Sequence, residues 1–353
     1  MINTPKIRSL RLAVTGLLSA LLTTTLLDPV FAQAADQPVK VFILAGQSNM
    51  VGHGKAEDGR NPNFDPKQPE SKANPKEIPG GLGCLRAMVN ESPAKFGANG
   101  TTPLVDADGH WLVRKDVKIY AYCDGKTRKG NLTLGFAAPG ASTWFGPEFG
   151  FGHIVGNALN DEVLIIKVAT GGTSLAKDWR PPGAVAKRGG AVGPRYTHMV
   201  KTVHEVLAHL GQEFPEFAGR SYEVAGFGWH QGWQDGGDQK MAAEYEANMA
   251  DFIQDVRKEF NPDMAFVIAN SGFFGEKQKG IRVEVREAQD AMANAEKHPE
   301  FKGNVAVVDT RPMWRDESVS PSNFGYHWNH NGYTHYEIGA GMGEAMVTLL
   351  KQR

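Results

Sequence analysis

A short apolar run that ends abruptly at a glycine constrains the fold of this chain more than any other feature. Residues 39–45 read Val-Lys-Val-Phe-Ile-Leu-Ala, which is typical of a strand buried on both faces of a parallel sheet. In open α/β sheets the carboxyl ends of such strands carry functional residues. Ser48 stands at this end, and Gly46 allows a sharp turn that would expose the Ser48 hydroxyl and N–H to the same space. Ser48 is therefore a candidate nucleophile; the alternative is that it only caps a helix.

Strands and helices alternate along the rest of the chain. Apolar runs with high β propensity predict strands at residues 112–122, 163–169, 222–229, 264–269 and 305–308. Helical spacing of apolar residues predicts helices at 196–210, 241–260, 283–297 and 333–351. This alternation predicts an α/β fold with a mostly parallel sheet and helices on both faces, in which the strand ends share one edge.

The first 35 residues have the layout of a secretory signal peptide. Basic residues precede an apolar stretch at 12–27, and small residues follow it. The stretch is shorter than the ~20 residues of a membrane span, so we expect cleavage, a secreted or periplasmic location and no membrane attachment afterwards. Residues 36–353 would form one domain with a loop-rich insertion at about 55–115, which is too long for a simple connection.

Charge and cysteine content limit the partners. The chain has 38 basic and 39 acidic residues, which gives no electrostatic reason to expect nucleic acid or an anionic membrane surface. We expect an uncharged or small partner. Cys84 and Cys123 are the two cysteines, and in an exported protein we expect them to form a disulfide rather than remain free.

Three further segments carry unusual residues. Thr-Gly-Gly-Thr-Ser at 170–174 follows one strand, His-Gln-Gly-Trp-Gln-Asp at 230–235 follows the next, and Gly-Tyr-His-Trp-Asn-His at 325–330 precedes the last helix. Acyl transfer needs a nucleophile, a base and donors aimed at a developing oxyanion. Ser48 can be the nucleophile and His327 the base. The candidate oxyanion donors are the backbone of Ser48, Gly171 and Gly172 and the side-chain amides of Gln231 and Gln234.

Each of these residues also has a structural interpretation. The glycines could serve only a tight turn, and Gln231 could satisfy a buried backbone group. His327, His330 and His335 could be metal ligands, but no Glu-bearing zinc motif accompanies them. Residues 106–109 begin like a calcium loop and lack its remaining ligands, so they predict a turn. We expect no metal and no cofactor.

Four blocks taken in order resemble a known family. Residues 46–50, 171–174, 229–232 and 326–328 are similar to the motifs of the SGNH hydrolase superfamily, in particular the sialate O-acetylesterase-like group, or carbohydrate esterase family six, which is acetylxylan esterase-like. The resemblance implies a three-layer α/β/α flavodoxin-like fold and a Ser-His esterase without cofactor. It implies that Ser48 is nucleophile and oxyanion donor, that Gly171 is the second donor, and that His327 is the base.

The chain departs from that family at two positions. Superfamily members usually have Asn where this chain has Gln234, while Gln231 matches the His-Gln-Gly of the esterase group, so the third oxyanion donor is open between them. The Asp that commonly lies three residues before the catalytic His is Phe324 here. Either the site works as a dyad, or Asp309 or Asp235 supplies the carboxylate.

These observations predict a serine esterase that removes O-acetyl groups from carbohydrates, either acetylated polysaccharide or sialic acid, through an acyl-enzyme. The side chains expected to bind the sugar are Gln47, Asn49, Trp179, Arg180 and Trp233. Trp144 and Trp328 also lie near the motif loops, and we expect at least two of the four tryptophans there to be packing residues. A lipase or thioesterase on the same fold, and a non-catalytic sugar-binding protein on a degenerate esterase scaffold, are the alternatives.

Overall fold

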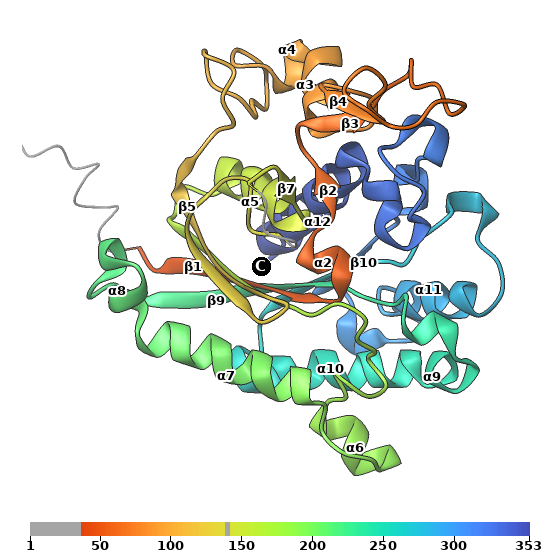
Figure 1. Ribbon diagram of the computed structural model, residues 1–353. Coiled ribbons are helices and arrows are strands. Elements are labelled where there is room, and N and C mark those ends of the chain that lie inside the picture. Colours follow the sequence, from red (N-terminus) through yellow and green to blue (C-terminus); the bar gives the residue numbers. More distant parts are fainter. Residues whose placement is uncertain (1–36, 138–141) are drawn as a thin grey trace, which may run out of the picture. The chain divides into compact units, whose positions relative to one another are not determined.

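A seven-stranded sheet with the order β11-β10-β9-β1-β8-β5-β6 forms the middle layer of the protein (Figure 1). The structure, a computed structural model, describes residues 37–137 and 142–353, so the predicted signal peptide lies outside the described residues. The strands are β1 (Val39–Gly46), β5 (Arg114–Cys123), β6 (Lys126–Leu132), β8 (Val163–Ala169), β9 (Tyr222–His230), β10 (Ala265–Ala269) and β11 (Val305–Val308).

The order of the parallel strands identifies the topology. All neighbours pair in parallel except β6, which turns back antiparallel on β5 at the edge. Without the β5–β6 hairpin, the remaining strands follow the order 2-1-3-4-5 of flavodoxin-like folds. This confirms the predicted flavodoxin-like α/β fold. Its topological switch point lies at β1, between β8 and β9, and ligands bind outside the carboxyl ends of the strands at such a point.

Helices cover both faces of the sheet (Figure 1). On one face lie α7 (Pro194–Ala208), α10 (Tyr245–Phe260) and α11 (Ile281–Ala291). On the other face α5 (Pro147–Ala158) packs against α12 (Gly332–Lys351). Alternate residues of β1 enter the two cores: Val41 and Ile43 face α7 and α10, whereas Phe42 and Leu44 face α5 and α12. Each such side chain contributes about 1.5–3 kcal/mol by burial, which explains why β1 is apolar without a break from Val41 to Ala45.

Short elements complete the described chain. The excursion between β1 and β5 holds α2 (Ser48–Val51), β2 (Gly54–Lys55), β3 (Asp58–Arg60), β4 (Glu77–Pro79), α3 (Leu85–Glu91) and α4 (Pro93–Phe96), and β2 pairs with β7 (Trp144–Phe145). The other helices are α6 (Pro182–Arg188), α8 (Leu210–Glu213) and α9 (Gln239–Ala243). The 3-10 turns are η1 (Pro215–Phe217), η2 (Asp235–Gly237), η3 (Gly275–Lys277), η4 (Pro299–Phe301), η5 (Arg311–Met313), η6 (Glu317–Val319) and η7 (Gly325–His330). In the described ranges, no helix is long and apolar enough to cross a membrane.

The two cysteines are free, so the expected disulfide is wrong. Cys84 precedes α3 in the excursion and donates its thiol to the Gly81 carbonyl. Cys123 ends β5 and packs in the core beneath α5 and α12. The two thiols are therefore buried in different surroundings, and burial raises the pKa of Cys123 to about 11.

Candidate active site

The turn after β1 places Ser48 at the switch point. Gly46 has φ +155°, and a Cβ there would lie 2.1 Å from the carbonyl oxygen of His230 on β9, so only glycine fits. The Gln47 N–H then donates to the same carbonyl, at 3.2 Å, and α2 begins at Ser48. Ser48 retains 9% exposure. Within the described ranges, neither the Ser48 hydroxyl nor its N–H has a hydrogen-bond partner, so both are available to a substrate.

The glycines after β8 lie beside this serine. A Cβ placed on Gly171 would be 3.7 Å from the Ser48 Cβ. The Gly171 N–H, however, donates to Asp124 Oδ1 at 2.8 Å, and Asp124 is held at φ +47° just after β5. The Gly172 N–H has no partner in the described part of the chain. Gly172 is thus the freer donor of the two, and Gly171 could serve only if the Asp124 carboxylate moved away.

The two candidate glutamines have different environments. Gln231 is buried, and its Nε2 donates to the Thr173 carbonyl at 3.0 Å and to Asp235 Oδ2 at 2.6 Å, while its Oε1 accepts from the Tyr245 hydroxyl at 2.8 Å. Both of its amide hydrogens are used, so it holds the glycine loop in place. Gln234 is exposed, and its side-chain amide has no partner among the described residues. Of the two side-chain amides, the Gln231 amide is therefore engaged, and the Gln234 amide is available to a ligand.

His327 lies in η7, a segment with unusual backbone conformation. The three residues after it, Trp328, Asn329 and His330, all have φ between 51° and 57°. Non-glycine residues held in this region cost roughly 1–3 kcal/mol each and cluster at functional sites. Burial of the Trp328 ring and a 2.9 Å hydrogen bond from Asn329 Nδ2 to the Arg315 carbonyl hold the segment.

A hydrogen bond joins the serine turn to this histidine segment. Asn49 Nδ2, on the residue after Ser48, donates to the Tyr326 carbonyl at 3.0 Å, on the residue before His327. The nucleophile and base candidates are therefore brought into the same region. The Ser48 hydroxyl and the His327 ring are not hydrogen-bonded to each other, and such contacts are often long before substrate binds.

Aromatic rings, rather than charges, surround His327. Its ring stacks on His53 with centroids 3.7 Å apart and meets the Tyr326 ring at 4.4 Å. Burial lowers the pKa of His327 to about 4. The imidazole is therefore neutral at neutral pH and able to accept a proton. No carboxylate in the described ranges hydrogen-bonds to it.

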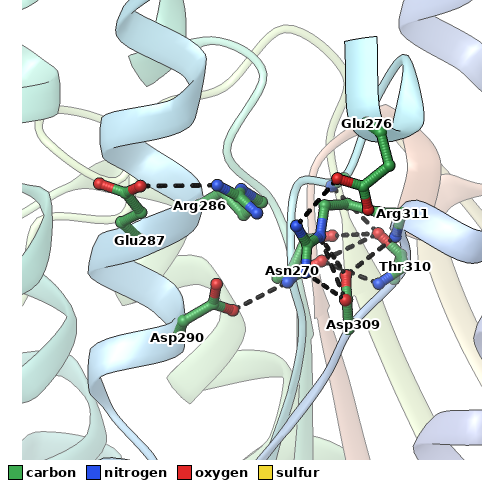
Figure 2. A network of polar contacts seen from close by, with 9 residues as sticks. Asn270, Glu276, Arg286, Glu287, Asp290, Asp309, Thr310 and Arg311 are labelled. Carbon is green, nitrogen blue, oxygen red and sulfur yellow. Dashed lines mark hydrogen bonds and ion pairs between the residues drawn. The ribbon is translucent and has the colours of Figure 1, made fainter. Parts of the chain in front are cut away.

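The two carboxylates considered as triad members are held elsewhere. Asp309 pairs with Arg311 at 2.7 Å in the network of Figure 2, which also contains Asn270 and Thr310. Asp235 is buried and accepts from the N–H groups of the loop after β8 at 2.9 and 3.0 Å. That burial raises the pKa of Asp235 to about 6. Neither carboxylate is therefore placed to orient the His327 ring.

Residues 128–347 match the family model described as "Carbohydrate esterase, sialic acid-specific acetylesterase". The chain belongs to this family. The match spans more than half of the chain and includes Gly171, Gln231 and His327, whereas Ser48 precedes it.

One of three similar solved structures gives the fold of this family member a second line of support. An X-ray structure of a protein from Arabidopsis thaliana has a TM-score of 0.51 at 18% identity, covering 88% of this chain and 98% of that one. A carbohydrate acetylesterase from Xanthomonas citri has a TM-score of 0.46 at 13% identity, over 87% and 55% of the two chains. NanS has a TM-score of 0.45 at 14% identity, over 90% and 99%. The first of these shows a shared fold. No curated protein sequence matches the chain.

Most side chains expected to bind sugar have structural partners in this family member. Trp179 is fully buried, donates to Thr173 Oγ1 at 2.9 Å and packs edge-on against another core tryptophan, so it cannot stack on a ligand. Trp328 is also fully buried, as expected for at least two of the four. Arg180 pairs with Glu244 at 2.9 Å. Gln47 and Asn49 are buried and hydrogen-bonded to neighbouring loops.

Trp233 remains half-exposed and lines a cavity of about 550 Å³ beside the histidine segment. Its aromatic walls are Trp233, Phe274, Trp314 and Tyr326, and its polar lining includes Asp316, Glu317, Ser318, Asn323 and Asn329. Sequence reasoning missed Phe274 and Trp314. Phe274 comes shortly after the carboxyl end of β10, and Trp314 shortly after that of β11. Their position at the edge where parallel sheets bind ligands could have indicated them from the sequence.

Proposed function

We propose that the protein is a serine esterase that removes O-acetyl groups from carbohydrates, with Ser48 as nucleophile and His327 as base. Membership of a carbohydrate esterase family supports the reaction class. The observation that carries the residue assignment is the hydrogen bond from Asn49 to the Tyr326 carbonyl, because it ties the serine turn directly to the histidine segment at the switch point.

The proposed reaction has two acyl-transfer steps. Ser48 Oγ attacks the acetyl carbonyl while its proton passes to His327, and the collapsing tetrahedral intermediate expels the sugar oxygen, which takes that proton. Water then gives a proton to His327 and attacks the acetyl-serine. The second intermediate releases acetate, and the proton returns to Ser48 Oγ. The unpartnered N–H groups of Ser48 and Gly172, with the Gln234 amide, are the donors proposed for both oxyanions.

The aromatic cavity supports a sugar as the leaving group. The cavity borders both the histidine segment and the loop after β9, because Tyr326 and Trp233 line it. Aromatic faces bordered by amide and carboxylate groups suit a ring with one apolar face and several hydroxyls. Near His327 the exposed large apolar side chains of the described residues are Phe324 and Tyr326, both aromatic. This favours a sugar over the extended acyl chain of a lipase or thioesterase substrate.

Acetate release tests the proposal. Wild-type protein is assayed on acetylated xylan and on O-acetyl sialic acid, and one of the two should yield acetate at least tenfold faster. Ser48→Ala should lower turnover by several orders of magnitude without unfolding, since it removes one oxygen at a strand end. Ser92→Ala is the matched control, because Ser92 is exposed in the excursion and its hydroxyl has no partner in the described chain.

Two outcomes would contradict the proposal. Wild-type protein that binds either sugar without releasing acetate would be a sugar-binding protein on this scaffold. A folded Ser48→Ala variant that retained more than a few per cent of turnover would need another nucleophile.

We also propose a secreted or periplasmic location with residues 36–353 as the mature chain, supported by the basic, apolar and small residues of the first 35 positions. Amino-terminal sequencing of exported protein tests this. A mature chain that still began at residue 1 would contradict it.

A further inference from the structure

Three histidine rings meet at the edge of the candidate active site. His53 follows α2, and His327 and His330 come from η7. One ring nitrogen from each lies within 4.8 Å of the other two. The rings are nearly parallel: His53 stacks on His327 at 3.7 Å, and His330 lies 5.8 Å from each. Segments far apart in sequence therefore bring three imidazoles together in one stack, with one nitrogen of each near the other two.

We propose that His53, His327 and His330 form a site for a transition-metal ion of the Zn²⁺ class, and that an ion bound there inhibits the enzyme by occupying His327. The inhibitory part rests on the proposed function, because it needs His327 to be the base. The binding part depends only on the three rings.

The donor set suits such an ion. Imidazole nitrogens favour Zn²⁺, Cu²⁺ and Ni²⁺, whereas Mg²⁺ needs oxygen ligands. Zn–N bonds of about 2.0–2.1 Å in tetrahedral geometry place ligand nitrogens about 3.4 Å apart. The observed nitrogens lie within 4.8 Å of one another. Side-chain rotations that draw them closer and turn the rings out of their parallel stack toward one centre would complete the site. Three protein ligands leave the fourth position to water.

The ring nitrogens of these three histidines are free to bind. In the described ranges none of the three side chains has a hydrogen-bond partner. His335, which sequence reasoning grouped with His327 and His330, is not part of the cluster. It is fully buried beside Gly54, and its Nε2 faces the His327 carbonyl oxygen at 3.4 Å. His335 can thus support the backbone of the site while His53 takes its place among the ligands.

Other side chains of types that bind Zn²⁺ lie elsewhere in the described chain, so variants can distinguish them from this site. Asp106, Asp108 and His110 also bring three ligand atoms within 4.8 Å of one another, on a surface turn. Exposed groups of this kind are common without an ion. Both thiols are buried with raised pKa values, which disfavours the thiolate that metals bind. His110→Ala therefore supplies a control that removes the surface group alone.

Zinc titration of the full chain tests the site. Protein stripped with a chelator is titrated calorimetrically with ZnCl₂, and with MgCl₂ for comparison. We expect one Zn²⁺ per chain bound at the histidine site, at least tenfold weaker binding in His53→Ala and in His330→Ala, and unchanged binding there in His110→Ala. Absence of stoichiometric binding, equal affinity in His53→Ala and wild type, or loss of binding in His110→Ala would overturn the proposal.

Acetate release tests inhibition. Metal-free wild type should be active, and Zn²⁺ should inhibit it with a midpoint close to the dissociation constant. His53→Ala should need at least tenfold more Zn²⁺ for the same fractional inhibition. Activation by Zn²⁺ would overturn the inhibitory role. The two proposals fail differently: no acetate from metal-free wild type defeats the proposed function, whereas active protein that does not bind Zn²⁺ defeats only the metal site.

Discussion

The candidate site has two halves, the serine turn after β1 and the histidine segment η7, and the two are held in opposite ways. Ser48 follows a strand whose neighbours pair with it on both sides, and every residue of α2 is buried. His327 lies in the half-exposed 3-10 turn η7, whose last three residues have left-handed backbone. A few tertiary contacts, chiefly the Trp328 ring and two asparagine side chains, hold that turn. The serine half is joined directly to the sheet through β1, whereas the histidine half depends on what packs around it.

A buried ion pair lies behind the serine turn. Lys167 of β8 is fully buried, and its Nζ donates to Glu148 at 2.6 Å and to the carbonyl of Val51, the last residue of α2, at 2.8 Å. The ammonium thereby fixes the end of the helix that begins with Ser48. No ion pair in the described ranges supports η7 from within the core in the same way. We therefore expect stability to depend most on the ion pair behind the serine turn, and turnover to depend on residues of both halves.

The largest expected effect is on the histidine side. His327→Ala should lower turnover by several orders of magnitude. Because burial lowers the pKa of His327 to about 4, wild-type activity should be retained from neutral pH downward and fall as the pH drops through about 4. An unperturbed histidine would place that fall near 6.5. A pH–rate profile of kcat/KM checks this, with the exposed His204→Ala as control. An inactive His330→Ala beside an active His327→Ala would reassign the base.

The serine side should respond in stability. Lys167→Met leaves Glu148 buried without its partner, which costs about 3–5 kcal/mol of unfolding free energy. Urea denaturation measures the loss. The matched control is Lys129→Met, because Lys129 pairs with Glu213 at the surface, where removal costs about 0–1 kcal/mol. Equal losses of unfolding free energy in the two variants would show that the buried ion pair adds no more stability than the surface pair.

Cutting the connection between the halves should affect catalysis more than folding. Asn49→Ala removes the hydrogen bond to the Tyr326 carbonyl. We expect kcat to fall about tenfold to a hundredfold, roughly 1.4–2.7 kcal/mol, with KM little changed. Asn61→Ala is the matched control, since Asn61 donates to the Pro75 carbonyl within the excursion. If Asn49→Ala lowers stability and leaves kcat unchanged, the bond is only structural.

The smallest expected effect is at Asp309. Its carboxylate pairs with Arg311 and does not reach His327, so Asp309→Asn should lower turnover tenfold or less, about 1.4 kcal/mol. Arg311→Gln, which breaks the same pair from the other side, should behave alike. A heavy loss of turnover in Asp309→Asn but not in Arg311→Gln would instead support a triad of Ser48, His327 and Asp309.

Local pattern predicted most of the sheet and its main helices. The strand expected at 163–169 is β8, with the same bounds, and the strand expected at 222–229 extends by one residue to His230. The helix expected at 241–260 divides at Glu244 into α9 and α10. We did not predict β6, whose Lys-Thr-Arg-Lys-Gly-Asn composition suits an exposed edge strand, or α5, whose three glycines disfavour a helix in isolation.

By itself the sequence determined the strand that carries Ser48, the glycine that turns the chain there and the blocks that follow β8 and β9. These are local properties, because apolar runs and glycines act through their immediate neighbours. Tertiary structure alone decided that Gln231 is bound to Asp235 while the Gln234 side chain has no partner among the described residues. It alone decided that His53 and not His335 joins His327, and that the two cysteines stay apart. Each of these depends on which distant segments the sheet topology brings together, because the spacing of residues along the chain does not determine which of them meet in space.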